Sequence, residues 1–586
     1  MKTARVPSDT APDFAARSGN LPTRRAAVAF HLKAIVFRWR RTLGDLVHGA
    51  PRALGRHSID PGFTVVAESR SRLYPSASPA EFALQAGKVH NLRLAARALD
   101  GLLVPAGETF SFWANVGRAT RRRGFVPGRE LREGCVVPNI GGGLCQITNS
   151  LYDAALRANL EIVERHAHSR PVPESEFAGR DATVFWNYVD LRFRSHSAFQ
   201  IAVDMRADEL IVRLYSSTGE ASSGSTTAPS RSCETPSAES CETCGVADCF
   251  RHAAAEALPR SHGAAWMVDA YSPEIDAWMA TRRSPDDHLL LPLDSRRFRV
   301  GPYRWTTSSF TSVRQSPLTV VRRSLASRRL ASQGAARQRA LLKMDEAMAG
   351  DLARHLPPLA THVSVSQNLL PFLWREGLLG GRTFDVLMTR LPLHELESTL
   401  DRAATAHPGS STLADFRAPK GIVQAERQAL AAARNWITPH AAIAALAGDR
   451  AQLLEWKLPK AEPRRPGKAV VSPASTLGRK GAYELREAAR ALGIPLKLHG
   501  PILEAPDFWS GVSVSQVDAD WLADAAAVVL PAWVENQPRR LLQALAAGVP
   551  VITTRASGLH SIPGLFIIPE GDVAALIQSL SSILRD

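Results

Sequence analysis

Short apolar segments alternate with helical segments through the carboxyl-terminal part of this 586-residue chain. The apolar segments read KAVVSP, PLKLHG, AVVLPAW, PVITT and LFIIP, and the helical ones include AYELREAARAL and QPRRLLQALAAG. Repeated strand-helix units favour a parallel, doubly wound sheet whose ligands sit beyond the carboxyl ends of the strands. We therefore expect residues 461–586 to form one such lobe.

A second alternation precedes this lobe. DDHLLLPL, HVSVSQNLLPFLW and TFDVLMTRLPL are expected strands, and APKGIVQAERQALAAARNWITPHAAIAAL is expected to be rich in helix. This pattern indicates another α/β lobe over residues 261–460, with the proline-rich and charged joint LPKAEPRRPGK between the two lobes. The length of the chain also favours two to four domains, so we predict an α/β multidomain protein.

Two loops of the last lobe carry candidate ligand-binding residues. SPASTLGRKG places Arg479 and Lys480 between a strand and a helix, where cations and helix-start amides can hold a diphosphate. PAWVENQPRRLLQALAAGVPVI places Glu535 at another such edge, with Gln543 further along. These four side chains are the candidates for contacts to a phosphorylated ligand.

These motifs resemble the nucleotide-sugar lobe of GT-B glycosyltransferases, over roughly residues 469–584. In that family a glutamate pair spaced by seven residues contacts the donor sugar and the ribose, and arginine and lysine hold the pyrophosphate. The resemblance implies a retaining transferase with two Rossmann-like lobes and a UDP- or GDP-linked donor. Glu535 matches the first glutamate, whereas Gln543 replaces the second and Arg479 directly precedes Lys480. An amide bonds ribose hydroxyls more weakly than a carboxylate does.

A glycine-rich segment in the first half of the chain reads VVPNIGGGLCQITNSLYDAALRANLEIVERHAHSRPVP. The glycines lead to Cys145 at the predicted start of a helix that ends near Asn159. Free backbone N–H groups and the helix dipole at that end would favour a thiolate. A strand is expected next, and it would place His166 and His168 on one face.

A thiolate and a histidine are the parts of a nucleophile and base pair, so Cys145, His166 and His168 are candidate catalytic residues. Asp181, in RDATVFWNYVDLRF, would complete a cysteine, histidine and carboxylate set by orienting a histidine. It is equally well placed as a turn residue that starts the strand predicted there.

The segments PAGETFSFWANVG, GFVPGRELREGCVVPNIGGGLCQITNSLYDAAL, IVERHAHS and RDATVFWNYVDLRF together resemble the VanW family of bacterial envelope proteins, named for an accessory vancomycin-resistance protein. The resemblance implies an α+β domain over residues 55–216. Some members are implicated in peptidoglycan cross-linking as L,D-transpeptidases that use the cysteine of a GGG-x-CQ motif, which here is Cys145.

A serine- and threonine-rich linker with a cysteine cluster is expected over residues 217–260. It holds four of the six cysteines, namely Cys233, Cys241, Cys244 and Cys249. A C-x-x-C pair with two further cysteines can complete a tetrahedral thiolate site. Structural zinc is the first alternative, an iron-sulfur cluster the second, and thiols without metal the third.

Residues 1–54 form a basic segment that contains TRRAAVAFHLKAIVFRWRR. The apolar run is too short and too often interrupted by charge for a spanning helix, and it lacks a convincing cleavage site for a secretory signal. It predicts a helix that lies on a membrane surface or packs on the rest of the protein. We expect a cytoplasmic protein, with peripheral contact to the inner face of the membrane as the alternative to plain packing.

The net charge of +15 suits anionic partners such as nucleotide-sugar phosphates or anionic lipid. The sequence has no arginine-aromatic nucleic-acid motif, so we expect no nucleic-acid partner. The leading hypothesis is glycosyl transfer to an envelope glycan or lipid-linked acceptor. The alternatives are acyl transfer at Cys145 and a non-catalytic, envelope-associated binding protein.

Overall fold

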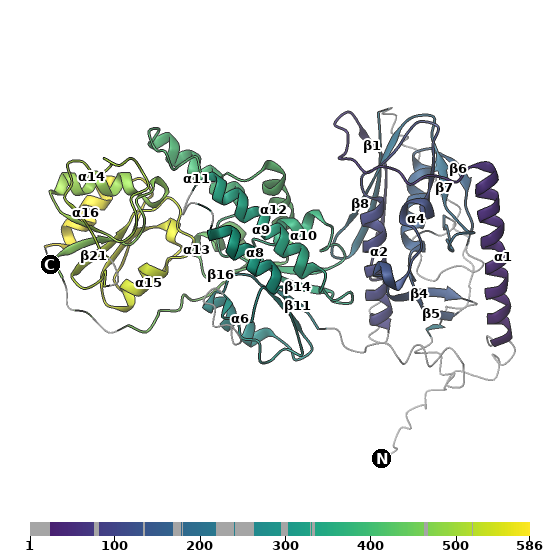
Figure 1. The fold of residues 1–586 in the computed structure, drawn as a ribbon, viewed down its shortest axis with the longest axis horizontal. Helices are drawn as coiled ribbons and strands as arrows, with labels where there is room; N and C mark the ends of the chain where they lie inside the picture. The colour runs from purple at the N-terminus through teal and green to yellow at the C-terminus, as the bar shows by residue number, and fades with distance from the viewer. Residues whose placement is uncertain are drawn as a thin grey trace, which may run out of the picture. The chain divides into compact units, whose positions relative to one another are not determined.

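The computed structural model divides the chain into two compact units, Met1–Ser261 and His262–Asp586. Figure 1 labels the helices and strands of each unit along the chain. The finer domain bounds expected from the sequence stay predictions. The structure describes residues 24–75, 81–132, 135–167, 177, 180–217, 239–240, 263–294, 303–328, 330, 334–415, 417–461, 464, 467–517 and 520–585.

The first unit combines helices with mainly antiparallel strands. Its helices are α1 (Arg24–His48), α2 (Phe82–Leu99), α3 (Phe112–Val116), the 3-10 turn η3 (Arg121–Arg123) and α4 (Cys145–Arg157). Its strands are β1 (Thr64–Arg72), β2 (Leu102–Val104), β3 (Thr109–Ser111), β4 (Pro127–Arg132), β5 (Cys135–Ile140), β6 (Glu161–Glu164), β7 (Arg192–Arg194), β8 (Phe199–Met205), β9 (Glu209–Ser216) and β10 (Glu239–Ser240). They pair in the orders β1-β9-β8-β2, β3-β7-β6 and β10-β5-β4. The mixed α+β character expected for this part is confirmed.

Helices α2 and α4 supply much of the core of this unit. Leu92 and Leu99 of α2 and Leu151 of α4 are fully buried, in one apolar cluster with Ile201 and Leu214 of the four-stranded sheet. The expected end of the helix near Asn159 is also found, because Asn159 has a left-handed φ of 53° just after α4. The start of α4 is thus fixed against a packed sheet.

The second unit begins with a seven-stranded parallel sheet in the order β13-β12-β11-β14-β15-β16-β17. Its strands are β11 (Ala265–Met267), β12 (His288–Leu291), β13 (Ser312–Gln315), β14 (His362–Ser366), β15 (Thr383–Leu387), β16 (Asn435–Thr438) and β17 (Ala451–Leu453). Its helices are α6 (Pro273–Arg282), α8 (Pro317–Arg328), α9 (Ala335–Ala353), α10 (Leu370–Arg375), α11 (Leu393–Ala406), α12 (Lys420–Ala432), α13 (Ala441–Ala447) and the 3-10 turn η5 (Gly448–Arg450).

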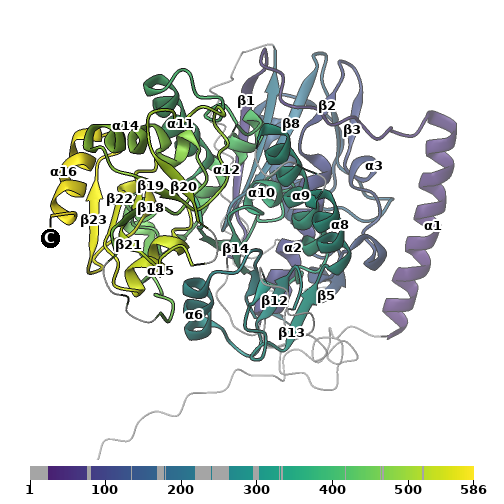
Figure 2. The same cartoon turned by 60° about the vertical axis from the view of Figure 1, so that its left-hand side comes forward.

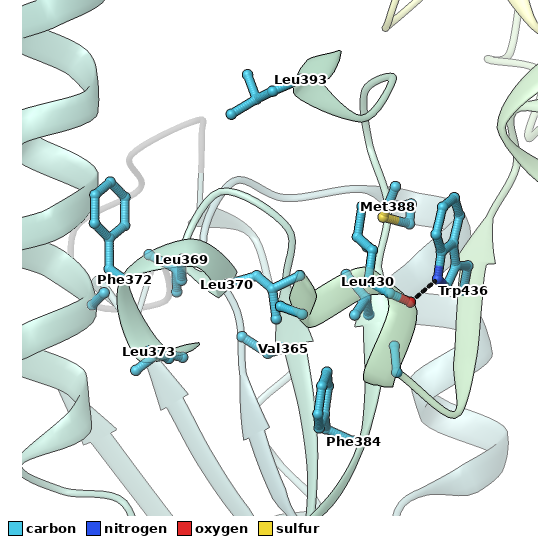
Figure 3. Close-up of a cluster of buried hydrophobic side chains, with 14 of the residues drawn as sticks. Val365, Leu369, Leu370, Phe372, Leu373, Phe384, Met388, Leu393, Leu430 and Trp436 are labelled. Carbon is cyan, nitrogen blue, oxygen red and sulfur yellow. Dashed lines mark hydrogen bonds between the residues drawn. The ribbon is translucent and has the colours of Figure 1, made fainter. Parts of the chain in front are cut away.

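Alternate side chains of these strands enter different cores, as period-two geometry requires. Met267 and Val365 pack with α9, α10 and α12 on one face, whereas Trp266 and Leu289 pack with α6 on the other. Figure 3 shows part of the first of these cores, where the Trp436 indole N–H donates to the Leu430 carbonyl at 3.2 Å. Helices on both faces explain why the central strands β11, β14 and β15 are buried on both faces.

A six-stranded parallel sheet follows, in the order β20-β19-β18-β21-β22-β23. Its strands are β18 (Ala469–Ser472), β19 (Leu496–Leu498), β20 (Val514–Gln516), β21 (Ala525–Leu530), β22 (Val551–Thr554) and β23 (Leu565–Ile568). Its helices are η6 (Gly478–Lys480), α14 (Ala482–Leu492), α15 (Arg539–Ala546), η7 (Arg555–Ser557) and α16 (Val573–Ile583). Figure 2 shows α14 and α16 on one side and α15 on the other, and the two apolar clusters of this lobe divide in the same way. The predicted doubly wound lobe is confirmed.

One strand prediction in the first unit is wrong. RDATVFWNYVDLRF was expected to be a strand, but β7 takes only its end and a single bridge joins Phe185 and Val189. The buried Asp190 carboxylate accepts hydrogen bonds from Ser111 and from the Trp113 backbone N–H. Side-chain bonds of this kind replace a regular backbone ladder.

Candidate functional site

Two loops meet at the carboxyl edge of the six-stranded sheet. The loop after β18 carries Arg479 and Lys480, and the loop after β21 carries Glu535. β18 and β21 are neighbours, and the chain runs outward from them in opposite directions, to β19 on one side and β22 on the other. This reversal is the switch point at which doubly wound sheets bind ligands.

The two loops are joined by direct bonds. The Lys480 ammonium donates to a Glu535 carboxylate oxygen at 2.8 Å and to the Val534 carbonyl at 3.1 Å. The backbone N–H groups of Trp533 and Val534 donate to the Arg479 carbonyl at 3.0 and 3.1 Å. Lys480 and Glu535, predicted from separate motifs, therefore face each other.

Gly481 permits this close approach. Its φ is 75°, and a Cβ there would lie 2.0 Å from the Pro531 carbonyl oxygen. Another residue at this position would force the loop after β18 away from the end of β21.

Burial and charge set the electrostatics of the pair. Burial alone would raise the pKa of the Glu535 carboxyl, but the charge and hydrogen bond of Lys480 hold that pKa below its ordinary value. Burial lowers the pKa of the neighbouring Arg479 guanidinium. The site thus places the Lys480 and Arg479 cations beside the ionised Glu535 carboxylate in a largely desolvated place, and the Asp415 and Glu504 carboxylates also act on Arg479.

Glu504, which follows β19, links the loop after β18 to the first lobe of the unit. The buried carboxylate of Glu504 accepts from the Gly478 backbone N–H at 2.7 Å and from the Ser410 hydroxyl at 2.9 Å. Thr412 and Tyr483 also donate to it. The segment after α11 is thereby tied to the loop that presents Arg479 and Lys480.

His440 makes a second link between the lobes. It follows β16, and its Nε2 lies 3.1 Å from the Glu535 carbonyl and 3.2 Å from the Ala556 carbonyl. The Ile443 backbone N–H donates to its Nδ1 at 3.4 Å. These partners require a neutral ring that donates from Nε2, and burial lowers the pKa of His440 accordingly.

A third link was not predicted from the sequence. Glu274 of α6 is fully buried and accepts from both terminal nitrogens of Arg539, at 2.7 Å each. Arg539 begins α15, four residues after Glu535. Burial would raise the pKa of Glu274, but Arg539 holds it below its ordinary value. Glu274 and Arg539 are 265 residues apart in sequence, so local pattern carries no signal for this pairing.

Gln543 lies on α15 with an exposed side chain. It lies on the same helix as Arg539 and takes no part in the contacts that join Lys480 to Glu535. Its expected contact with a ribose stays a prediction.

Cys145 is the first residue of α4, as predicted, and it is half-buried. Its sulfur lies 3.5 Å from the Thr183 hydroxyl. The glycine turn before it is held from α2, because the Asn91 amide donates to the carbonyls of Val126 and Gly142 at 3.0 Å each. A Cβ on Gly142 would lie 2.3 Å from the Gly128 carbonyl oxygen, so the turn requires glycine there.

The histidine geometry differs in part from expectation. β6 ends at Glu164, so His166 lies in the loop that follows and the strand does not set its face. Its ring is exposed and lies 3.3 Å from the Glu164 carboxylate, while its carbonyl accepts from the Thr183 N–H. The Asp181 carboxylate pairs with Arg165 at 3.1 Å. His168 lies outside the described residues, so the catalytic set of Cys145, histidine and Asp181 stays a prediction.

The cysteine cluster also lies outside the described residues, namely Cys233, Cys241, Cys244 and Cys249. In the part of the chain that the structure describes, no group of histidine, cysteine or carboxylate side chains has the arrangement of a metal site. Zinc and iron-sulfur binding by the cluster therefore stay predictions.

Two protein-family models match separate parts of the chain, one in each unit. Residues 87–215 match the model "VanW like protein", and residues 507–586 match "Glycosyl transferases group 1". The chain carries a VanW-like domain and a glycosyltransferase group 1 domain. The second match includes Glu535 and α15, so the loop after β21 lies within a glycosyltransferase-like region.

Two curated proteins resemble the VanW-like domain. The uncharacterized protein YoaR of Bacillus subtilis (strain 168) is 39% identical over 130 residues, which cover 22% of this chain and 43% of that protein. The vancomycin B-type resistance protein VanW of Enterococcus faecalis (strain ATCC 700802 / V583) is 34% identical over 154 residues, or 25% of this chain and 56% of that protein. The chain thus spans about half the length of these relatives.

Two solved structures resemble about half of the chain weakly. Sucrose-phosphate synthase (tll1590) from Thermosynechococcus elongatus has a TM-score of 0.34 and 15% identity, covering 56% of this chain and 87% of that one. WaaG, a glycosyltransferase involved in lipopolysaccharide biosynthesis, has a TM-score of 0.31 and 14% identity, covering 55% and 90%. The assignment of two Rossmann-like lobes of GT-B type rests on the sheet orders and the family match.

No helix within the described ranges is both long and apolar enough to cross a bilayer.

Proposed function

We propose that the second unit transfers a glycosyl group from a nucleotide-sugar donor to a cell-envelope glycan or a lipid-linked acceptor. The observation that carries this proposal is the Lys480–Glu535 pair at the switch point of a sheet whose second part, residues 507–586 with Glu535, matches a glycosyltransferase family. A cation at this edge neutralises a donor diphosphate, and the adjacent carboxylate lies where the donor sugar would follow.

Each chain residue has a distinct role in this proposal. Lys480 and Arg479 would stabilise the charge that develops on the departing diphosphate, which lowers the barrier to transfer. Glu535 would orient the donor sugar, and Gln543 would bond the ribose. We further propose that the donor is UDP- or GDP-linked and that the reaction retains the anomeric configuration, which NMR of the product anomer tests.

Two substitutions separate binding from transfer. We expect Lys480→Gln to weaken binding of the donor roughly tenfold to hundredfold, because a charge-assisted bond is worth about 1.5–3 kcal/mol. Glu535→Gln removes the carboxylate that now pairs with Lys480. The variant protein should therefore bind UDP or GDP as well as wild type or better, and it should transfer sugar more slowly. Calorimetry with UDP- and GDP-sugars and a radiolabelled transfer assay give the two readouts.

Lys497→Gln is the matched control. Lys497 pairs with Asp524 at 3.0 Å in the same lobe but away from the switch point. An equal loss of donor affinity in Lys480→Gln and Lys497→Gln would refute the donor site. Donor binding without transfer to envelope acceptors would instead leave a non-catalytic binding protein.

A second candidate function is acyl transfer at Cys145. It is supported by the position of the sulfur at the start of α4, where the helix dipole favours a thiolate, and by the half-buried setting beside Thr183. The thiolate would attack the acyl carbon of a peptidoglycan stem peptide and expel an amine. An amine or water would then resolve the thioester.

Mass spectrometry of the full chain with a stem-peptide probe tests this candidate. We expect an acyl adduct on Cys145 that Cys145→Ser abolishes and Cys135→Ser leaves intact. An adduct that survives Cys145→Ser would exclude this thiol as the nucleophile. The cytoplasmic location expected from the sequence remains part of the proposal, and cell fractionation tests it.

A further inference from the structure

Helix α1 packs on the first unit by one face. Ala34 is buried, the Phe37 ring stacks on Tyr188 with centroids 5.6 Å apart, and the Arg38 Nε donates to the Trp186 carbonyl at 2.8 Å. Asp45 lies 3.6 Å from Arg192 in β7. These contacts fix the rotation of the helix about its axis, so its opposite face is defined.

That opposite face carries large apolar side chains that are open to solvent. Of the 23 exposed large hydrophobic residues in the described chain, nine lie on α1. Six recur every three or four positions and form what we call the outer stripe: Val28, Leu32, Ile35, Trp39, Leu43 and Leu46. Trp39 is 67% exposed and Leu46 is 77% exposed. A concentration of this size on one helix marks an interaction surface.

The charges beside the outer stripe are basic. Arg24, Arg25, Lys33 and Arg40 are exposed, whereas Arg38 faces the domain. The one acidic residue of the helix, Asp45, lies on the packed side beside Arg192. A partner of this face must therefore supply negative charge as well as an apolar layer.

Helix α8 of the second unit repeats the pattern independently. Leu318, Val321 and Leu325 are 74%, 55% and 51% exposed at helical spacing. Arg322 and Arg328 are exposed with them, and the helix has no acidic residue. Two helices in different units thus combine exposed leucine and valine with exposed arginine.

We propose that α1 docks the protein on an anionic lipid bilayer by the outer stripe, with α8 as a separate second contact. An amphipathic helix of this composition lies in the headgroup plane, with its apolar side chains in the acyl boundary and Trp39 at headgroup level. The basic residues then face lipid phosphates. This contact requires no glycosyl or acyl transfer, so it stands independently of the proposed function.

A second copy of the chain fits this face less well. Helix pairs held by an apolar seam place opposite charges beside it, but two outer stripes would bring Lys33 and Arg40 against the same cations. Like charges at that position oppose the pairing. An anionic surface meets both requirements of α1 at once.

Flotation of the full chain with vesicles tests the proposal. We expect binding to vesicles of phosphatidylcholine with phosphatidylglycerol, little binding to phosphatidylcholine alone, and release as salt is raised. Trp39→Glu with Leu43→Glu should abolish binding. Lys33→Gln with Arg40→Gln should weaken it roughly thirtyfold, since each basic residue near an anionic surface contributes about fivefold. Leu318→Glu with Val321→Glu tests α8 separately.

Leu458→Glu is the matched control, because Leu458 is an exposed leucine outside both helices. Circular dichroism and light scattering, run without lipid, check folding and oligomeric state. Unchanged flotation of the Trp39→Glu, Leu43→Glu variant would overturn the proposal, and so would equal binding to both vesicle types. A lipid-free dimer that this variant dissociates would assign the outer stripe to a second copy instead.

Discussion

The Glu274–Arg539 pair predicts an asymmetric response to substitution. Glu274 is fully buried, and besides Arg539 its carboxylate accepts from the Ser272 hydroxyl at 2.9 Å and from the Lys457 backbone N–H at 3.1 Å. The Arg539 side chain is 36% exposed. Losing Arg539 therefore strands a buried carboxylate, whereas losing the carboxylate leaves a guanidinium that can turn to water.

The magnitude follows from this difference. Removing one partner of a buried pair costs about 3–5 kcal/mol, and the exposure of Arg539 with the two remaining donors places Arg539→Gln near the low end. We expect about 3 kcal/mol for Arg539→Gln, which is a roughly hundredfold increase in opening of this contact. Glu274→Gln should cost about 1–2 kcal/mol, because the amide keeps an oxygen for the Ser272 hydroxyl and the Lys457 N–H.

Hydrogen exchange of the full chain is the assay, because it reports opening of α6 and the start of α15 separately from global unfolding. Arg464→Gln is the control, since its ion pair with Asp520 is 38% and 64% exposed and surface pairs contribute less than about 1 kcal/mol. Faster exchange in Glu274→Gln than in Arg539→Gln would refute the reasoning. So would an effect of Arg464→Gln as large as that of Arg539→Gln.

Three further outcomes are expected. The neutral, buried ring of His440 stabilises the fold above the unfolded pKa of about 6.5 and loses this effect as the pH falls below it, because only the unfolded chain then binds the proton. Denaturant unfolding at pH 7.5 and 5.5 should show a smaller difference between wild type and His440→Asn at the lower pH, and a constant difference would contradict this. Gly558→Ala should displace that ring, since its Cβ would lie 2.2 Å from it, and should lower the denaturant midpoint to a similar extent as His440→Ala. Asn91→Ala should destabilise the first unit by about 2–3 kcal/mol, because the Val126 N–H and two carbonyls lose their partner. Thermal unfolding of this variant checks the last value, and a loss of less than about 0.5 kcal/mol would show that water replaces the amide.

Local pattern was sufficient for most of the sheet architecture. KAVVSP and PVITT are apolar runs bounded by turns, and both are strands in the second unit. Buried parallel strands need continuous apolar sequence, so pattern and structure agree there. AYELREAARAL was expected to be helical, and it is α14 from its first residue to its last. Its apolar face has a strict helical period.

Tertiary context decided the elements that pattern missed. AAWMVDAYSPEIDAWM, for which no element is predicted from the sequence, contains β11 and most of α6, and NWIT within a helix-rich stretch is β16. Neither β11 nor β16 stands out as an apolar run bounded by turns, and each is a strand because a neighbour pairs with it. FSFWANV begins as β3 and becomes α3, whose cap is the Ser111 hydroxyl accepting from the Ala114 N–H.

Local pattern predicted part of the candidate site, and tertiary context determined the rest. Lys480 and Glu535 could be placed from sequence because strand-loop-helix order alone puts both at one edge of a parallel sheet. The partners that hold them could not, since Glu504 and His440 contact these loops, and Glu274 contacts the start of α15, across sequence separations of 26 to 265 residues. Burial explains these contacts, because a carboxylate that is removed from water needs hydrogen-bond donors, and the tertiary fold determines which residues supply them. The positions of Lys480 and Glu535 therefore follow from local strand-loop-helix order, while the loops that carry them are held by distant residues such as Glu504 and His440.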